Sequence, residues 1–116
     1  MNPTQWDMGY FEVLLGYDWE MTNSPSGHVQ WTPTAASNAD QPVAAHDSSI
    51  TEALMMTTAD MALKFDPQYE KISKHFHANP QEFANAYARA WFKLTHRDMG
   101  PINNYLGEEV PSETFI

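Results

Sequence analysis

Few residues in this chain have the types and spacing that could do chemistry. Five histidines lie along the sequence: His28, His46, His75, His77 and His96. No two of them are four residues apart and no HExxH motif occurs, so the usual helical zinc pattern is missing. His75 and His77 are two residues apart, which places them on different faces of a helix. We therefore predict surface histidines and no metal site.

The sequence also lacks the motifs of common nucleophiles and phosphate sites. It contains no GxSxG motif and no glycine-rich phosphate loop. It has no cysteine, which excludes a disulfide scaffold, a thiolate metal site and a cysteine nucleophile. Four tryptophans and seven methionines are more typical of a core, although they would also suit a flat apolar cofactor. The residues alone indicate no complete active site.

Asp60 is the carboxylate with the most informative surroundings, because it follows Met55 and Met56 in an otherwise apolar stretch. Thr57 and Asp60 have the spacing of a capping box, and an acidic residue in the first turn also favours the helix dipole. This structural interpretation is the simpler one. The functional alternative is a buried acceptor that orients a histidine supplied from elsewhere, as carboxylates do beside metal-bound imidazoles.

Arg97 lies in the sequence His96-Arg97-Asp98, at the end of the last predicted helix. A cation at this position complements the negative end of the helix dipole. An arginine just before the Gly100-Pro101 break could also move with the adjoining loop. The residues do not select between these two roles.

The elements that must position these residues are mainly helical. The apolar periodicity and the capping signals predict helices over 6–15, 57–65, 67–76 and 80–97. Thr4 with Asp7 resembles a capping box before the first helix, and Asn79 with Glu82 resembles one before the last. Alternating aromatic residues predict a small β-hairpin over 17–32, which must pack on something larger because two strands are marginal alone. Residues 34–50, poor in apolar side chains, are predicted to form a loop.

Length and composition set further bounds. The 116 residues give room for one domain, and 42% of them are hydrophobic. The net charge of −9 argues against binding to nucleic acid or to an anionic membrane surface. No apolar run approaches the roughly 20 residues that a spanning helix needs, and the N-terminus lacks a signal-peptide pattern. We expect a cytoplasmic protein, with the periplasm as the alternative.

The charge is distributed unevenly. The first 63 residues carry eight carboxylates and no lysine or arginine, so all six basic side chains follow them. One interpretation is a solvated acidic surface suited to a high-salt environment. The other is that the partners of these carboxylates lie on another segment or chain.

Several segments of the chain match a known family of enzymes. They are WDMGYF (6–11), LLGYDWE (14–20), TNSPSG (22–27), TADMAL (58–63), DPQYEKI (66–72) and ARAWFKLTHRDMGP (88–101). These segments resemble the bacterial catalase-peroxidases, haem enzymes of the plant-peroxidase superfamily. The match covers essentially the whole chain apart from the 34–53 loop, and the block that ends in HRDMGP is the most specific.

The resemblance implies a mainly α, haem-peroxidase-like helical fold with one small β-hairpin. Residues 1–116 would then be the C-terminal part of an N-terminal haem domain, in an enzyme that uses haem b to remove hydrogen peroxide. Its catalase and broad-specificity peroxidase activities imply small organic electron donors, and the complete protein is expected to be a homo-oligomer.

Two site residues carry over by position. Asp60 matches the aspartate that accepts a hydrogen bond from the haem-ligating histidine, and Arg97 matches the mobile arginine that modulates the catalase reaction. No histidine here matches the haem ligand, and the chain offers no metal ligand or cofactor-binding residue of its own.

We therefore expect an incomplete haem domain that is inactive alone, with its packing partners on sequence that is not in this chain. The apolar faces of the hairpin and the last helix should then be exposed. The alternative is a non-catalytic acidic helical binding module derived from the same segment.

Overall fold

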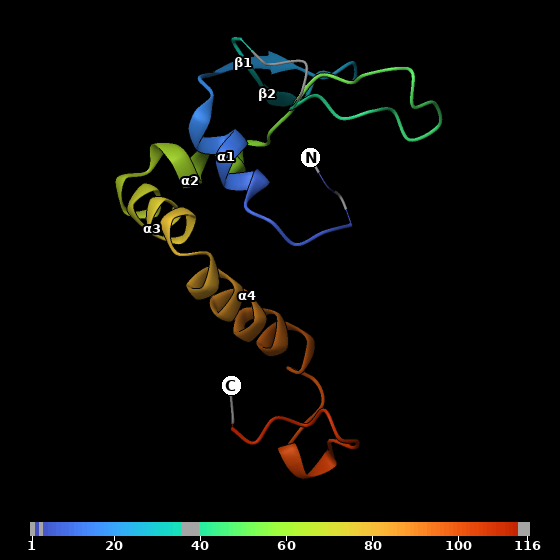
Figure 1. The fold of residues 1–116 in the computed structure, drawn as a ribbon, viewed down its shortest axis with the longest axis vertical. Coiled ribbons are helices and arrows are strands. Elements are labelled where there is room, and N and C mark those ends of the chain that lie inside the picture. The colour runs from blue at the N-terminus through green and yellow to red at the C-terminus, as the bar shows by residue number, and fades with distance from the viewer. Residues whose placement is uncertain (1, 3, 36–39, 114–116) are drawn as a thin grey trace. The chain divides into compact units, whose positions relative to one another are not determined.

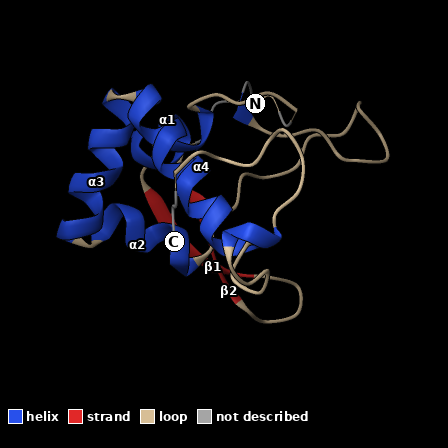
Figure 2. Cartoon of the chain, turned by 90° about the horizontal axis from the view of Figure 1, so that it is seen from below, coloured by secondary structure: helices blue, strands red, loops and turns tan. Residues whose placement is uncertain are grey.

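The computed structural model describes residues 2, 4–35 and 40–113. Along the chain it contains α1 (Gly9–Gly16), β1 (Trp19–Asn23), β2 (Val29–Pro33), α2 (Thr58–Phe65), α3 (Pro67–Ala78), α4 (Pro80–Thr95) and the short 3₁₀ helix η2 (Ile102–Asn104) (Figure 1). The described chain is mainly α with one β-hairpin, as predicted (Figure 2). Its residues group into two compact units, Met1–Ala78 and Asn79–Ile116. That the chain is part of one haem-peroxidase domain stays a prediction.

The first unit has a small apolar core between α1, α2 and the hairpin. Its buried residues are Val13, Leu14, Trp19, Leu54 and Met61. Leu14 and Met61 are fully buried, and burying a side chain of this size contributes about 1.5–3 kcal/mol. The Trp19 indole Nε1 donates to the Leu14 carbonyl at 3.0 Å, so β1 packs directly on α1. The hairpin thus has the larger support that its size requires.

The hairpin is antiparallel, with Trp19 opposite Pro33 and Met21 opposite Trp31. Its second strand also pairs with the segment that leads into α2. The Trp31 N–H donates to the Met56 carbonyl and the Met56 N–H donates to the Trp31 carbonyl, both at 2.9 Å. Two residues later α2 begins, so this bridge fixes the start of the helix that carries Asp60.

The first predicted helix, 6–15, begins three residues too early. Thr4 and Asp7 form no capping box, and Asp7 Oδ1 instead accepts from the Gly9 N–H at 2.9 Å. This short turn keeps residues 6–8 out of the helix, because the aspartate competes for the backbone donor two positions ahead. α1 therefore spans Gly9–Gly16.

The last predicted helix, 80–97, ends two residues too late. The His96 N–H still donates to the Phe92 carbonyl at 3.0 Å, but His96 has φ −109° and ψ 7°, outside the helical region. Gly100 then adopts a φ of +72°, the left-handed conformation that favours glycine. At the other end the Asn79 side chain does not cap α4, although the predicted start at Pro80 is correct. α3 also runs to Ala78, two residues beyond the predicted 76.

The predicted loop 34–50 falls partly on residues 36–39, which lie outside the described residues. Beyond them the Ala44 N–H donates to the Ile50 carbonyl at 2.9 Å and the Glu52 N–H donates to the Pro42 carbonyl at 2.8 Å. Ala44 is buried at the base of this turn. Backbone pairing therefore closes the second half of the segment on itself.

The second unit consists of α4 and the segment that follows it. The Phe92 and His96 rings stack at 3.8 Å, and Tyr105 lies against His96 at 5.2 Å between ring centroids. Arg89 forms an ion pair with Glu113 at 2.8 Å. These contacts join the segment after η2 to the second half of α4.

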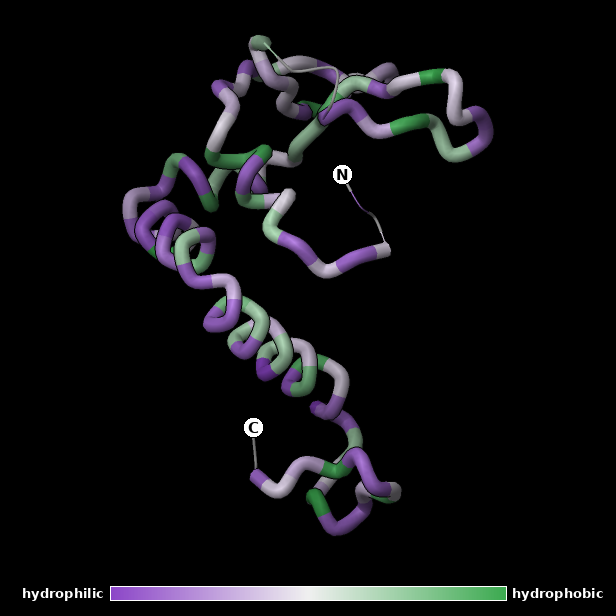
Figure 3. The backbone as a smooth tube through the Cα atoms, viewed as in Figure 1, coloured by the Kyte–Doolittle hydropathy of each residue, from purple (hydrophilic) through white to green (hydrophobic). Residues whose placement is uncertain are grey.

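Large apolar side chains are exposed where the sequence predicts it. In α4, all of whose residues are described, no residue is buried, and Tyr87, Trp91 and Leu94 are 47%, 57% and 61% exposed. Figure 3 shows hydrophobic positions recurring along this helix between hydrophilic ones. In the hairpin Met21 and Val29 are also exposed. Within the described part of the chain, no helix is both long and apolar enough to cross a membrane.

Candidate functional site

Asp60 lies in the first turn of α2, where it completes the capping box that the sequence predicts. Its Oδ2 accepts from the Thr57 N–H and from the Thr57 hydroxyl, both at 2.7 Å. The Thr57 Oγ1 in turn accepts from the Asp60 N–H at 3.3 Å. The predicted capping box is therefore confirmed, and Thr57 holds the Oδ2 oxygen of the Asp60 carboxylate in place.

The other carboxylate oxygen of Asp60 binds a residue that sequence reasoning missed. The Tyr10 hydroxyl, from the first turn of α1, donates to Asp60 Oδ1 at 2.7 Å. The two residues are 50 positions apart, so no local spacing could have revealed the pair. A signal was still present, since Tyr10 lies inside one of the matched segments and is a polar-tipped aromatic at the start of an apolar helix.

These contacts set the protonation state of the pair. Burial alone would raise the pKa of the Asp60 carboxyl, but the hydrogen bonds from Tyr10 and Thr57 outweigh it and lower that pKa below its usual range. Burial, and after it the hydrogen bond to Asp60, raise the pKa of the Tyr10 hydroxyl. Asp60 is therefore a carboxylate and Tyr10 a neutral donor at physiological pH.

The arrangement leaves Asp60 able to accept one further hydrogen bond. A carboxylate offers about four lone-pair positions. Among the described residues Thr57 uses two of them on Oδ2 and Tyr10 uses one on Oδ1. Asp60 is half-buried beside the buried Met61. The site can therefore hold a donor such as an imidazole N–H in a defined direction.

Arg97 belongs to the second unit, where it is exposed in the turn that follows α4. It lines an open pocket together with His96, Gly100, Pro101 and Tyr105. Its guanidinium forms no ion pair within the part of the chain that the structure describes. Asp60 belongs to the first unit and Arg97 to the second. The contacts of each residue are therefore described within its own unit.

The five histidines lie in different parts of the described chain and form no cluster. His28, His46 and His75 are exposed, whereas His77 stacks on Phe11 and His96 on Phe92. Residues 2, 4–35 and 40–113 contain no group of three or more His, Cys, Asp or Glu side chains that could hold a metal ion.

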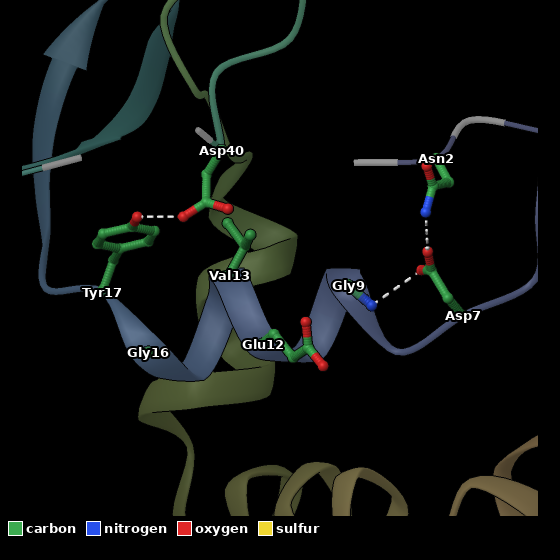
Figure 4. Close-up of a pocket in the computed structure, with 8 residues that line it drawn as sticks. All are labelled: Asn2, Asp7, Gly9, Glu12, Val13, Gly16, Tyr17 and Asp40. Carbon is green, nitrogen blue, oxygen red and sulfur yellow. Dashed lines mark hydrogen bonds between the residues drawn. The ribbon is translucent and has the colours of Figure 1, made fainter. Parts of the chain in front are cut away.

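A polar cavity lies beside α1 in the first unit. Figure 4 shows its lining, which comprises Asn2, Asp7, Gly9, Glu12, Val13, Gly16, Tyr17 and Asp40. The Tyr17 hydroxyl donates to Asp40 at one end, and the Asn2 amide donates to Asp7 at the other at 3.3 Å. The cavity is thus acidic, and its carboxylates at both ends are satisfied by protein donors.

Fold and site together describe a mainly helical segment that presents an oriented, ionised carboxylate at the N-terminus of a helix. No model of a known protein family matches the chain. Curated catalase-peroxidases do match it. That of Jannaschia sp. (strain CCS1) is 60% identical over 115 residues, that of Aliarcobacter butzleri (strain RM4018) 58%, and that of Geobacillus thermodenitrificans (strain NG80-2) 59%.

Each alignment includes 99% of this chain. The chain spans only 15–16% of the length of these relatives. The resemblance to the catalase-peroxidases is confirmed, and this chain is similar to one segment of such a protein.

Proposed function

We propose that this chain forms part of a haem catalase-peroxidase that removes hydrogen peroxide, and that it belongs to the haem domain of that enzyme. In this role Asp60 accepts a hydrogen bond from the haem-ligating histidine, which lies on sequence outside the chain. The observation that carries the proposal is the Asp60 carboxylate itself, ionised and fixed by Thr57 and Tyr10, in a segment that is 56–60% identical to catalase-peroxidases.

The residues present fit a haem site only in this supporting role. Haem b, when bound in the complete enzyme, supplies the iron at which hydrogen peroxide is converted. The Asp60 carboxylate fits because it is charged and keeps one lone pair on Oδ1 for an imidazole N–H. Accepting that bond makes the ring more imidazolate-like and a stronger donor to the iron.

Arg97 is the second residue of the proposal. Its exposure and the Gly100-Pro101 turn that follows it support the role of a mobile arginine, because no ion pair within the described residues restrains the guanidinium. We propose that this side chain modulates the catalase reaction.

The proposed partners are hydrogen peroxide, small organic electron donors and the remainder of the haem domain, in a cytoplasmic homo-oligomer. The exposed apolar side chains of α4 are then surfaces that the remainder of the domain covers. The chain alone is proposed to be inactive. A non-catalytic binding module is not favoured, since the relatives named above are catalase-peroxidases over the whole of the matched segment.

A segment exchange tests the proposal. The aligned segment of the Jannaschia catalase-peroxidase is replaced by this chain, and haem content and hydrogen peroxide turnover are measured. We expect the chimera to keep both, and Asp60→Asn in the chimera to lower turnover about 10- to 100-fold. Asp47→Asn, a matched change in an exposed turn, should leave turnover unchanged. A chimera that folds and binds haem but is indifferent to Asp60→Asn would refute the assignment.

A further inference from the structure

We propose that His96 is a positioning residue for Arg97, because its imidazole fixes the backbone from which the arginine side chain moves. The inference rests on the proposed function and deepens it, since it names the residue at the end of α4 that acts through Arg97. The observation that carries it is the 2.9 Å hydrogen bond between His96 Nδ1 and the Phe92 carbonyl.

Two aromatic rings of the second unit hold the His96 imidazole in place. It stacks on the Phe92 ring with centroids 3.8 Å apart and planes 13° from parallel. The Tyr105 ring contacts it at 5.2 Å, tilted by 54°. Aromatic pairs in such arrangements stabilise each other beyond the area that they bury. His96 is therefore half-buried, whereas Arg97 beside it is exposed.

The hydrogen bonds of the His96 ring decide which nitrogen carries the proton. A carbonyl oxygen only accepts, so Nδ1 is protonated and donates to Phe92. The Thr95 hydroxyl lies 3.0 Å from the same nitrogen and donates in turn to the Trp91 carbonyl at 2.9 Å. Side chains thus satisfy two of the last carbonyls of α4, which opposes fraying of the helix end.

Arg97 lies in the turn that begins at His96. The Met99 N–H donates to the His96 carbonyl at 3.3 Å and closes this turn. Gly100 follows with a φ of +72°. The Arg97 backbone is therefore restrained on both sides along the chain, and its guanidinium moves by side-chain rotation. Without the imidazole, the last turn of α4 should open more often and carry Arg97 with it.

The first test uses the 116-residue chain without haem. The ¹⁵N signals of the His96 ring are measured by NMR at a pH at which the ring is neutral. We expect the proton on Nδ1, whereas the exposed His46 should show a mixture of both neutral forms. A neutral His96 ring with its proton on Nε2 would overturn the proposal, since the bond to Phe92 could not form.

Variants of the same chain separate the hydrogen bond from the ring stack. His96→Asn keeps a donor in the place of Nδ1, and His96→Phe keeps a ring without a donor. His46→Phe is the matched control in an exposed segment. We expect the NMR order parameter of the Arg97 amide to fall in His96→Phe and to stay unchanged in the other two variants. An unchanged order parameter in His96→Phe would contradict the anchoring of the turn.

The second test measures catalase and peroxidase turnover in the chimeric enzyme. His96→Phe should lower catalase turnover about 3- to 10-fold, the effect that loss of one hydrogen bond typically has on an equilibrium. Peroxidase turnover should stay within about 2-fold of the unsubstituted chimera. His96→Asn should retain catalase turnover, because it keeps the donor. An equal loss of both activities in His96→Phe would show a general structural role and overturn the proposal.

A double variant distinguishes this inference from the proposed function. If His96 acts through Arg97, adding His96→Phe to Arg97→Ala should lower catalase turnover no further than Arg97→Ala does alone. A further loss as large as that of the single His96→Phe variant would overturn the positioning role. If Arg97→Ala leaves catalase turnover unchanged, the proposed function of Arg97 fails, whereas the anchoring by His96 is decided independently by the NMR measurements.

Discussion

Trp31 and Met56 pair through both of their backbone groups, at 2.9 Å in each direction. The bridge ties the second strand of the hairpin to the segment that enters α2. The Trp31 indole Nε1 reinforces it by donating to the Thr58 hydroxyl at 3.2 Å. The hairpin, which carries no candidate site residue of its own, therefore fixes the start of the helix on which Asp60 lies.

The capping box should contribute measurably to stability. Thr57→Ala removes the hydroxyl that donates to the Asp60 carboxylate and accepts from the Asp60 N–H. We expect the free energy of unfolding to fall by about 1 kcal/mol, as for other N-cap threonines. Urea denaturation followed by circular dichroism measures it. Thr51→Ala, an exposed control, should cost less, and an equal loss in both variants would rule out the capping contribution.

Acidification should weaken the fold partly through Asp60. The folded pKa of this carboxyl is lowered, so its contribution is fully present above the pKa of an unfolded aspartate, about 3.9. The contribution is lost as the pH falls through the folded value. Unfolding free energies measured from pH 6 to pH 2 should fall more steeply for the native chain than for Asp60→Asn. Parallel curves would show that Asp60 is not held as described.

The core of the first unit should be sensitive to cavities. Leu14 is fully buried, and Leu14→Ala should cost about 2–5 kcal/mol of unfolding free energy. Leu106 is 92% exposed, and Leu106→Ala should change that quantity by less than about 0.5 kcal/mol. Equal effects of the two substitutions in urea titrations would contradict the described core.

The exposed face of α4 should affect association more than folding. Trp91 is 57% exposed and stacks on Tyr87 at 6.3 Å. Trp91→Gln should change the unfolding free energy by less than about 0.5 kcal/mol and reduce self-association of the isolated chain in light scattering. Trp19→Gln is the contrasting variant, since Trp19 is buried, and it should destabilise the fold strongly. A large loss of stability in Trp91→Gln would mean that this face is covered.

The sequence pattern predicted those helix starts and ends that are decided by hydrogen bonds between neighbouring residues. The Thr57–Asp60 box formed because the bridge at Met56 holds Thr57 extended, with ψ at 167°, as an N-cap needs. The same pattern at Thr4 and Asp7 failed because Asp7 turned to the Gly9 N–H instead. Helix ends such as Thr95 also depend on which side chains reach the last carbonyls, here Thr95 Oγ1 to the Trp91 carbonyl.

Only one residue of the Tyr10–Asp60 pair could be predicted from the sequence. The resemblance and the capping spacing both selected Asp60, but neither could supply Tyr10, since their contact depends on α1 packing beside α2. Sequence periodicity gives the face of a helix and not its neighbour across the core. The structure was needed to show that the carboxylate carries three hydrogen bonds.

The iron reduction potential of Asp60→Asn in the chimeric catalase-peroxidase tests the central claim most directly. If Asp60 accepts the hydrogen bond of the haem-ligating histidine, neutralising it makes that ligand a weaker donor and raises the potential. A potential equal to that of the unsubstituted chimera, in a variant that binds haem normally, would contradict the role assigned to Asp60.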